Sequence, residues 1–148
     1  MPASAKYSIA AVDSGTNRSA WVVISEVSNF ETVLEGIEVG ASVHRALLTG
    51  TVRLLRSLQE NGGVRLSTES EYLYKGATQW LDGWRRRGWR KSDDKPVANK
   101  DLWIEIHGQL KRLDVEWQLD RRTNGDSSDS FVRIAARIAR DVLARSGS

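Results

Sequence analysis

Short apolar or alternating stretches predict five strands in this chain. Near the N-terminus, "YSIAAVD", "AWVVISE" and "ETVLEGIEV" are separated by short turns such as "SGTN", which is typical of an antiparallel meander. Gly36, inside the third stretch, is a candidate bulge. The first and fourth stretches end in an acid, Asp13 and Glu69 respectively. The predicted strands cover residues 7–13, 20–26, 31–39, 64–69 and 115–120.

Apolar residues at helical spacing predict the helices. One helix carries Leu47 through Leu58 and ends at "ENGG". A second runs from about Glu71 to Leu81, and Gly83 is expected to interrupt it. The stretch "KDLWIEIHGQLKRL" begins a third at Asn99 or Lys100, and the last runs over about 130–145. The order βββαβαβα predicts an α/β fold, with a five-stranded mixed sheet flanked by helices.

Composition limits the classes of protein that are compatible with this pattern. The chain has 148 residues, of which 40% are hydrophobic, so residues 1–148 are expected to form a single domain with one core. The absence of cysteine excludes disulfides, thiolate nucleophiles and cysteine-based metal sites. No apolar stretch is long enough to span a membrane, and the N-terminus lacks a signal-peptide pattern. We expect a cytoplasmic monomer with no membrane partner.

The positive charge is concentrated in one segment. Residues 83–103, here called the basic segment, contain seven Lys or Arg and three Asp, and with Asp82 included the balance equals the net charge of +3 of the whole chain. Clustered cations neutralise phosphates and release counterions, and tryptophan provides a stacking surface for bases. The competing interpretation is a solvated helical face whose tryptophans pack on one another. The candidate nucleic-acid-binding residues are Trp80, Trp84, Arg85, Arg86, Arg87, Trp89, Arg90, Lys91, Lys95 and Lys100.

The basic segment and the residues before it resemble the type 1 ribonucleases H. The similarity is strongest over "TESEYLYKGATQWLDGWRRRGWRKSDDKPVANKDLW", and "VEWQL" extends it toward the C-terminus. The resemblance implies a ribonuclease H-like fold, in which the basic segment forms the protrusion that grips the DNA strand of an RNA/DNA hybrid.

The resemblance also implies a two-metal site, which needs several carboxylates to hold two Mg²⁺ ions about 4 Å apart. Carried over by position, the first and third acids fall on Asp13 and Glu69. The second falls on Leu47 in "HRALL", the fourth on Arg133 in "DSFVRIAA", and the family's histidine on Thr123. We expect Arg133 to approach Asp13 or Glu69. A cation there opposes metal binding, because unit charges ~4 Å apart interact by roughly 4 kcal/mol at an effective dielectric of about 20.

Several interpretations of the same region remain open. Asp129 is a candidate substitute for the fourth acid. The alternative is that both Asp126 and Asp129 are loop or N-cap residues. His44 is either a metal ligand or a polar surface residue. A basic stripe comprises Arg133, Arg137 and Arg140 at helical spacing, with Arg121 and Arg122 in the loop before them. It is either a solvated face or a set of extra phosphate contacts.

Three functions compete on these grounds. The first is a protein that binds an RNA/DNA hybrid or another duplex with weak or no catalysis and no cofactor. The second is an active hybrid ribonuclease, dependent on Mg²⁺ or Mn²⁺, with an atypical acid set of Asp13, Glu69 and Asp129. The third is a domain that binds an unknown protein partner. The basic segment favours the first function, and Leu47 and Arg133 argue against the second.

Overall fold

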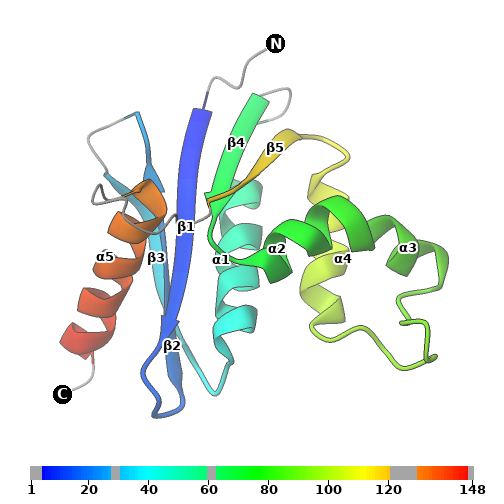
Figure 1. Ribbon diagram of the computed structural model, residues 1–148. Coiled ribbons are helices and arrows are strands. Elements are labelled where there is room, and N and C mark those ends of the chain that lie inside the picture. The colour runs from blue at the N-terminus through cyan, green and yellow to red at the C-terminus, as the bar shows by residue number, and fades with distance from the viewer. Residues whose placement is uncertain (1–4, 28–30, 60–62, 121–129, 147–148) are drawn as a thin grey trace.

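The computed structural model describes residues 5–27, 31–59, 63–120 and 130–146 (Figure 1). Its five strands form one mixed sheet in the order β3-β2-β1-β4-β5. β1 and β2 pair antiparallel, as do β2 and β3, whereas β1, β4 and β5 run parallel. The five-stranded mixed sheet predicted from the sequence is confirmed. The strands are β1 (Ala5–Asp13), β2 (Arg18–Ser25), β3 (Thr32–Val39), β4 (Gly63–Thr68) and β5 (Asp114–Leu119).

Helices cover both faces of this sheet (Figure 1). One face packs against α1, beyond which α2, α3 and α4 extend to one side, and the other face packs against α5. α1 begins after Ser42, whose side chain accepts a hydrogen bond from the backbone N–H of Arg45, as expected for an N-cap. The helices are α1 (Val43–Ser57), α2 (Glu71–Lys75), the π-helical turn η1 (Gly76–Trp80), α3 (Leu81–Arg86), α4 (Lys100–Gln109) and α5 (Phe131–Ser146).

The alternation of side chains along β1 divides the core into two clusters. Ile9 packs with Trp21 and Leu48 on the α1 side. Ala10 packs with Val22 and Ala135 on the α5 side, where small residues let the helix approach the sheet closely. In the part of the chain that the structure describes, no helix is long and apolar enough to cross a membrane.

The expected bulge at Gly36 was wrong. The irregularity lies earlier in β3, where Leu34 pairs with Val23 and Thr32 pairs with Ile24, so Val33 is the extra residue. A Cβ on Gly36 would come within 2.6 Å of the indole of Trp21. Close packing against a buried ring therefore explains this glycine.

The expected helix break at Gly83 was also wrong. Helical backbone continues from α2 through η1 into α3, and Gly83 lies inside α3. The irregularity is the π-helical turn at Gly76, whose Cα faces the ring of Trp103 so closely that a Cβ would lie 2.5 Å from Cζ2. The basic segment consequently begins on a helix that packs against α4.

This contact predicts opposite effects for two helical glycines. Gly76→Ala should lower the free energy of unfolding by roughly 1–3 kcal/mol, because the added methyl overpacks the Trp103 ring. In Gly83→Ala the new Cβ would meet only Arg87, at 3.7 Å, and the variant should gain about 0.5–1 kcal/mol from helix propensity. Urea unfolding of both variants tests the contact, and equal stabilisation by both would contradict it.

Candidate functional site

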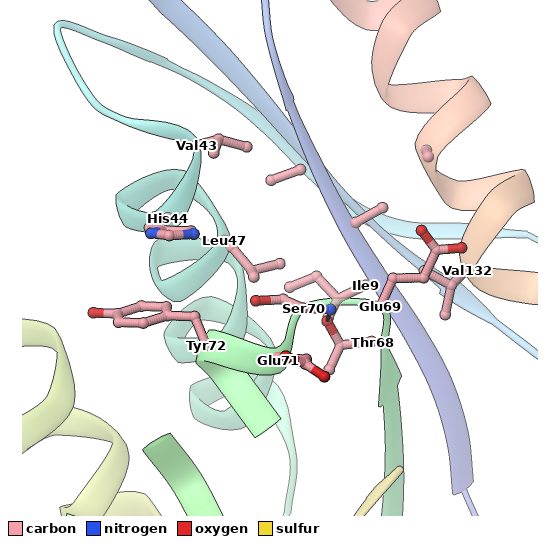
Figure 2. Close-up of a pocket in the computed structure, with 13 residues that line it drawn as sticks. Ile9, Val43, His44, Leu47, Thr68, Glu69, Ser70, Glu71, Tyr72 and Val132 are labelled. Atoms are coloured by element: carbon pink, nitrogen blue, oxygen red, sulfur yellow. Dashed lines mark hydrogen bonds between the residues drawn. The ribbon is translucent and has the colours of Figure 1, made fainter. Parts of the chain in front are cut away.

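A cavity of about 410 Å³ opens where β4 ends. Glu69 follows β4 directly, α1 provides His44 and Leu47, and α5 provides Val132. Figure 2 shows Leu47 and Val132 on either side of the cavity, with the Glu69 carboxylate beside Val132. The apolar side chains that line it are Ile9, Ala10, Ala11, Val43, Leu47, Val132 and Ala136. The other lining residues are polar: His44, Thr68, Glu69, Ser70, Glu71 and Tyr72. The cavity therefore has a mixed wall in which apolar side chains are slightly more numerous.

Arg133 and Glu69 form an ion pair beside this cavity. Nε of Arg133 lies 3.5 Å from Oε1 of Glu69, with side-chain exposures of 24% and 41%. The prediction that Arg133 approaches one of the two acids is confirmed. Leu47, which stands where the resemblance expects a second acid, is 4% exposed and belongs to the core.

Asp13 lies away from the cavity. It pairs with Ser19 at the end of the β1–β2 hairpin and accepts a hydrogen bond from the backbone N–H of Gly15. Ser8 is the partner of Ser67, so Asp13 stands three residues further along the sheet than Glu69, or roughly 10 Å at ~3.3 Å per residue. Ala10 is level with Glu69 instead and lines the cavity. The resemblance implies that Asp13 and Glu69 belong to one site, but the structure does not bring their side chains together.

The other candidates in the C-terminal loop cannot be placed. Asp126, Asp129, Thr123, Arg121 and Arg122 all lie outside the described residues. Their roles remain predictions from the sequence.

The described residues do not fit a two-metal site. Among residues 5–27, 31–59, 63–120 and 130–146, no group of three or more His, Asp or Glu side chains is arranged to hold an ion. Glu69 pairs with Arg133, and Glu71 lies 3.7 Å from Nζ of Lys75. Magnesium requires near-octahedral oxygen ligation, and two carboxylates with cationic neighbours supply it poorly.

The basic segment presents its charges to solvent. Arg85, Arg86 and Arg87 are exposed, and no ion pair found among the described side chains involves them. Arg90 and Lys91 contact Asp94 and Asp93 at only 4.0 and 3.9 Å, and such exposed pairs contribute little. Lys95 and Lys100 are exposed as well. The segment therefore keeps a high density of accessible cations.

The tryptophans beneath these cations pack on one another. Trp103 is fully buried, and Trp84 meets it edge-on with the ring centres 5.3 Å apart. Trp80 lies 5.8 Å from Trp84 and is 38% exposed, and Trp89 packs edge-on against His107. The packing interpretation thus holds for Trp84, Trp89 and Trp103, and Trp80 is the most exposed ring for stacking.

A hydrogen-bond network that the sequence analysis missed connects the cavity with the basic segment. The hydroxyl of Tyr72, which lines the cavity, accepts hydrogen bonds from Nε1 of Trp103 at 2.9 Å and Nδ2 of Asn99 at 3.3 Å. The ring of His44 stacks on Tyr72 at 4.4 Å, so an aromatic contact partly covers the histidine. Sequence spacing gave no signal for this network because its members lie on three separate helices.

A second missed contact fixes the end of the basic segment on α1. The guanidinium of Arg45 pairs with Asp101 at 2.7 Å and also donates to Asn99. The hydrogen bond between Arg45 and Asp101 lowers the pKa of Asp101 and raises the pKa of Arg45. Asn99 itself adopts a left-handed backbone with φ of 58°, a conformation that asparagine tolerates better than most residues.

Comparison with known proteins identifies the family. The family model described as RNase H matches residues 7–130. Ribonuclease HI of Xylella fastidiosa strain 9a5c is 36% identical over 117 residues, which cover 79% of this chain and 78% of that protein. Ribonuclease H of Xanthomonas campestris pv. campestris is 33% identical over the same shares. The chain belongs to the type 1 RNase H family.

Solved structures of this family share the fold. The PFV RNase H domain matches with a TM-score of 0.71 at 14% identity, over 95% of this chain and 92% of that one. LC9-RNase H1, described as a type 1 RNase H with the type 2 active-site motif, matches with a TM-score of 0.67 at 21% identity, over 100% of this chain and 75% of that one. At these identities the likeness concerns the RNase H fold alone.

His107 reports on the charge of the basic segment. Burial lowers its pKa below the ordinary 6.5, and the charges of Lys111 and Arg85 lower the pKa further. Arg85→Gln should therefore raise the His107 pKa, whereas Arg86→Gln should leave it nearly unchanged. Because the folded state binds the proton less tightly than the unfolded state, the free energy of unfolding should fall as the pH drops below about 6.5. NMR titration of the His107 ring measures the shift, and an equal effect of both variants would contradict this account.

The ion pair and Leu47 together predict how a metal site is restored. The double variant Leu47→Glu and Arg133→Asp should add two carboxylates beside Glu69 and gain Mn²⁺ binding that the parent lacks. Without metal it should lose on the order of several kcal/mol of stability, because Leu47 is a buried position, and Mn²⁺ should restore part of that loss.

Thermal unfolding and calorimetric titration with Mn²⁺ measure both effects. Adding Glu69→Gln to the double variant is the matched control, and it should remove the gain. If the parent binds Mn²⁺ as tightly as the double variant, the conclusion that Leu47 and Arg133 prevent metal binding in the cavity is wrong.

Proposed function

We propose that this RNase H family protein binds duplex nucleic acid, an RNA/DNA hybrid first of all, and cleaves it weakly or not at all. The observation that carries the proposal is the row of exposed cations at Arg85, Arg86 and Arg87, which is supported from beneath by packed tryptophans. Phosphate neutralisation by such a row supplies most of the affinity for nucleic acid.

The residues around Glu69 support the second half of the proposal. A hydrolytic two-metal site must present negative charge to two cations. Here the carboxylate of Glu69 faces a guanidinium, and Leu47 puts hydrocarbon where the family pattern has an acid. Arg133 compensates the charge of Glu69 and so weakens its attraction for Mg²⁺.

The alternative is an active hybrid ribonuclease dependent on Mg²⁺ or Mn²⁺. Its support is that the relatives in Xylella and Xanthomonas are named ribonucleases, and that a protein of similar fold was solved with an RNA/DNA hybrid, with a TM-score of 0.70 at 14% identity over 95% of this chain and 20% of that one. This function would need Glu69 to act with Asp129, because Asp13 lies away from the cavity. In either case we propose that residues 1–148 act as a single-domain, cytoplasmic monomer.

The binding half of the proposal predicts a salt-dependent affinity that resides in the basic segment. Replacing Arg85, Arg86, Arg87 and Arg90 together by Gln should weaken hybrid binding and flatten the plot of log affinity against log salt by about 0.9 for each lost phosphate contact. Fluorescence anisotropy with a labelled RNA/DNA hybrid measures both quantities. When Mg²⁺ is added, the parent protein should cleave the hybrid no faster than the Glu69→Gln variant does.

A matched pair of double variants gives the control. The first variant, in which Gln replaces Arg85 and Arg86, should have a lower affinity for the hybrid. The second variant loses the same charge on α1, where Gln replaces Arg53 and Arg56, and its affinity should change little. Equal losses in both would refute a specific role for the basic segment. Robust metal-dependent cleavage that Glu69→Gln abolishes would establish the ribonuclease instead.

A further inference from the structure

The last helix carries a line of arginines that the proposed function leaves unused. Arg133, Arg137 and Arg140, here called the arginine stripe, follow i, i+4, i+7 spacing on α5 and therefore share one face of the helix. Arg137 and Arg140 are exposed. At 1.5 Å per residue, the stripe spans roughly 10 Å, a length over which a nucleic-acid backbone presents more than one phosphate.

The charge balance of α5 argues that this stripe faces a polyanion. The helix contains four arginines and only one acid, Asp141. Like charges four residues apart repel by about 0.2–0.5 kcal/mol, so Arg133 and Arg137 oppose helix formation slightly. Such a cost is relieved when phosphates lie over the stripe.

Arg133 has donors available beyond its ion pair. Its Nε is the atom nearest to Glu69, and no hydrogen bond within the described part of the chain uses Nη1 or Nη2. Its side chain is 24% exposed beside the cavity. A guanidinium presents five N–H donors in a planar fork that matches phosphate geometry, so Arg133 can hold Glu69 and donate to a phosphate at the same time.

The position of the stripe completes the argument. Figure 1 shows α5 alongside β1 on one side, while α2 and α3 lead away from the end of β4 on the other side. The cavity lies between them, because it takes Val132 from α5 and Tyr72 from α2. A duplex that crosses the cavity can therefore contact the basic segment with one part of its backbone and the arginine stripe with another.

We propose that the arginine stripe is a second phosphate-binding surface, and that Arg133 contributes there the positive charge that metal ions supply in a two-metal site. The inference rests on the proposed function, since it concerns the same duplex. It has a consequence of its own, which is that duplex binding requires no divalent cation. A fixed guanidinium stays in place when Mg²⁺ is removed.

The experiment measures hybrid affinity by anisotropy at constant ionic strength, in EDTA and in Mg²⁺. The parent should bind equally well, or better, in EDTA. Replacing Arg133, Arg137 and Arg140 by Gln should weaken binding by about tenfold or more and lower the salt slope by roughly two to three units, at about 0.9 per contact. Circular dichroism of the variant checks that α5 is intact.

A single pair of variants on the same helix supplies the matched control. Arg140→Gln should lower affinity, whereas Arg145→Gln, an exposed arginine off the stripe, should not. Equal effects of these two, or tighter parent binding in Mg²⁺, would overturn the inference. If the stripe variants bind normally while the variants of the basic segment fail, the proposed function stands and this inference falls. If the parent does not bind the hybrid, both fall.

Discussion

The packing of one indole determines where the basic segment can lie. Trp103 is fully buried between Gly76 of η1 and the edge of Trp84, and its Nε1 donates to Tyr72. These contacts join α2, α3 and α4 into one body, although each of the first two is too short to be stable alone. The arginines of α3 owe their fixed position to a hydrophobic contact rather than to any interaction of their own.

The pair Arg133–Glu69 has a different kind of influence, because it decides which chemistry the fold supports. The RNase H fold places side chains from β4, α1 and α5 around one cavity, so each position contributes to the local electric field. Hydrocarbon at Leu47 and a cation at Arg133 make that field less negative than a site with acids at both positions would have. A less negative field repels phosphate oxygens less, so the proposed combination of duplex binding with weak or no cleavage is physically consistent.

The sequence predicted the elements well because their periodicity is local. The alternation of burial along β5 and the three-to-four spacing in α1 and α5 follow from which face each element buries. The ion pair was also predictable, since the family pattern placed Arg133 near Glu69. Asp13 was misplaced because the turn around it matched the family, while the distance along β1 depends on pairing with β4, which a single strand does not reveal.

The two glycines show the same limit. Gly36 and Gly76 resemble a bulge and an ordinary helical residue in sequence, yet both exist to admit an indole from elsewhere in the chain. Their partners, Trp21 and Trp103, lie on other elements. Nothing local distinguishes such a glycine from one like Gly83, where an added Cβ would meet only the side chain of Arg87.

The π-helical turn has a consequence for the direction in which the cations point. Each residue advances an α-helix by about 100°, since a turn holds 3.6 residues, and the wider turn at Gly76–Trp80 delays everything after it by about one residue. The turn therefore sets the angular phase of α3. Deleting one residue of this turn would leave the arginines of α3 in the sequence but would rotate their face by about a quarter of a turn. In the proposed binding mode, that rotation would turn the cations away from a duplex over the cavity, so the phase of this helix matters as much as its charge.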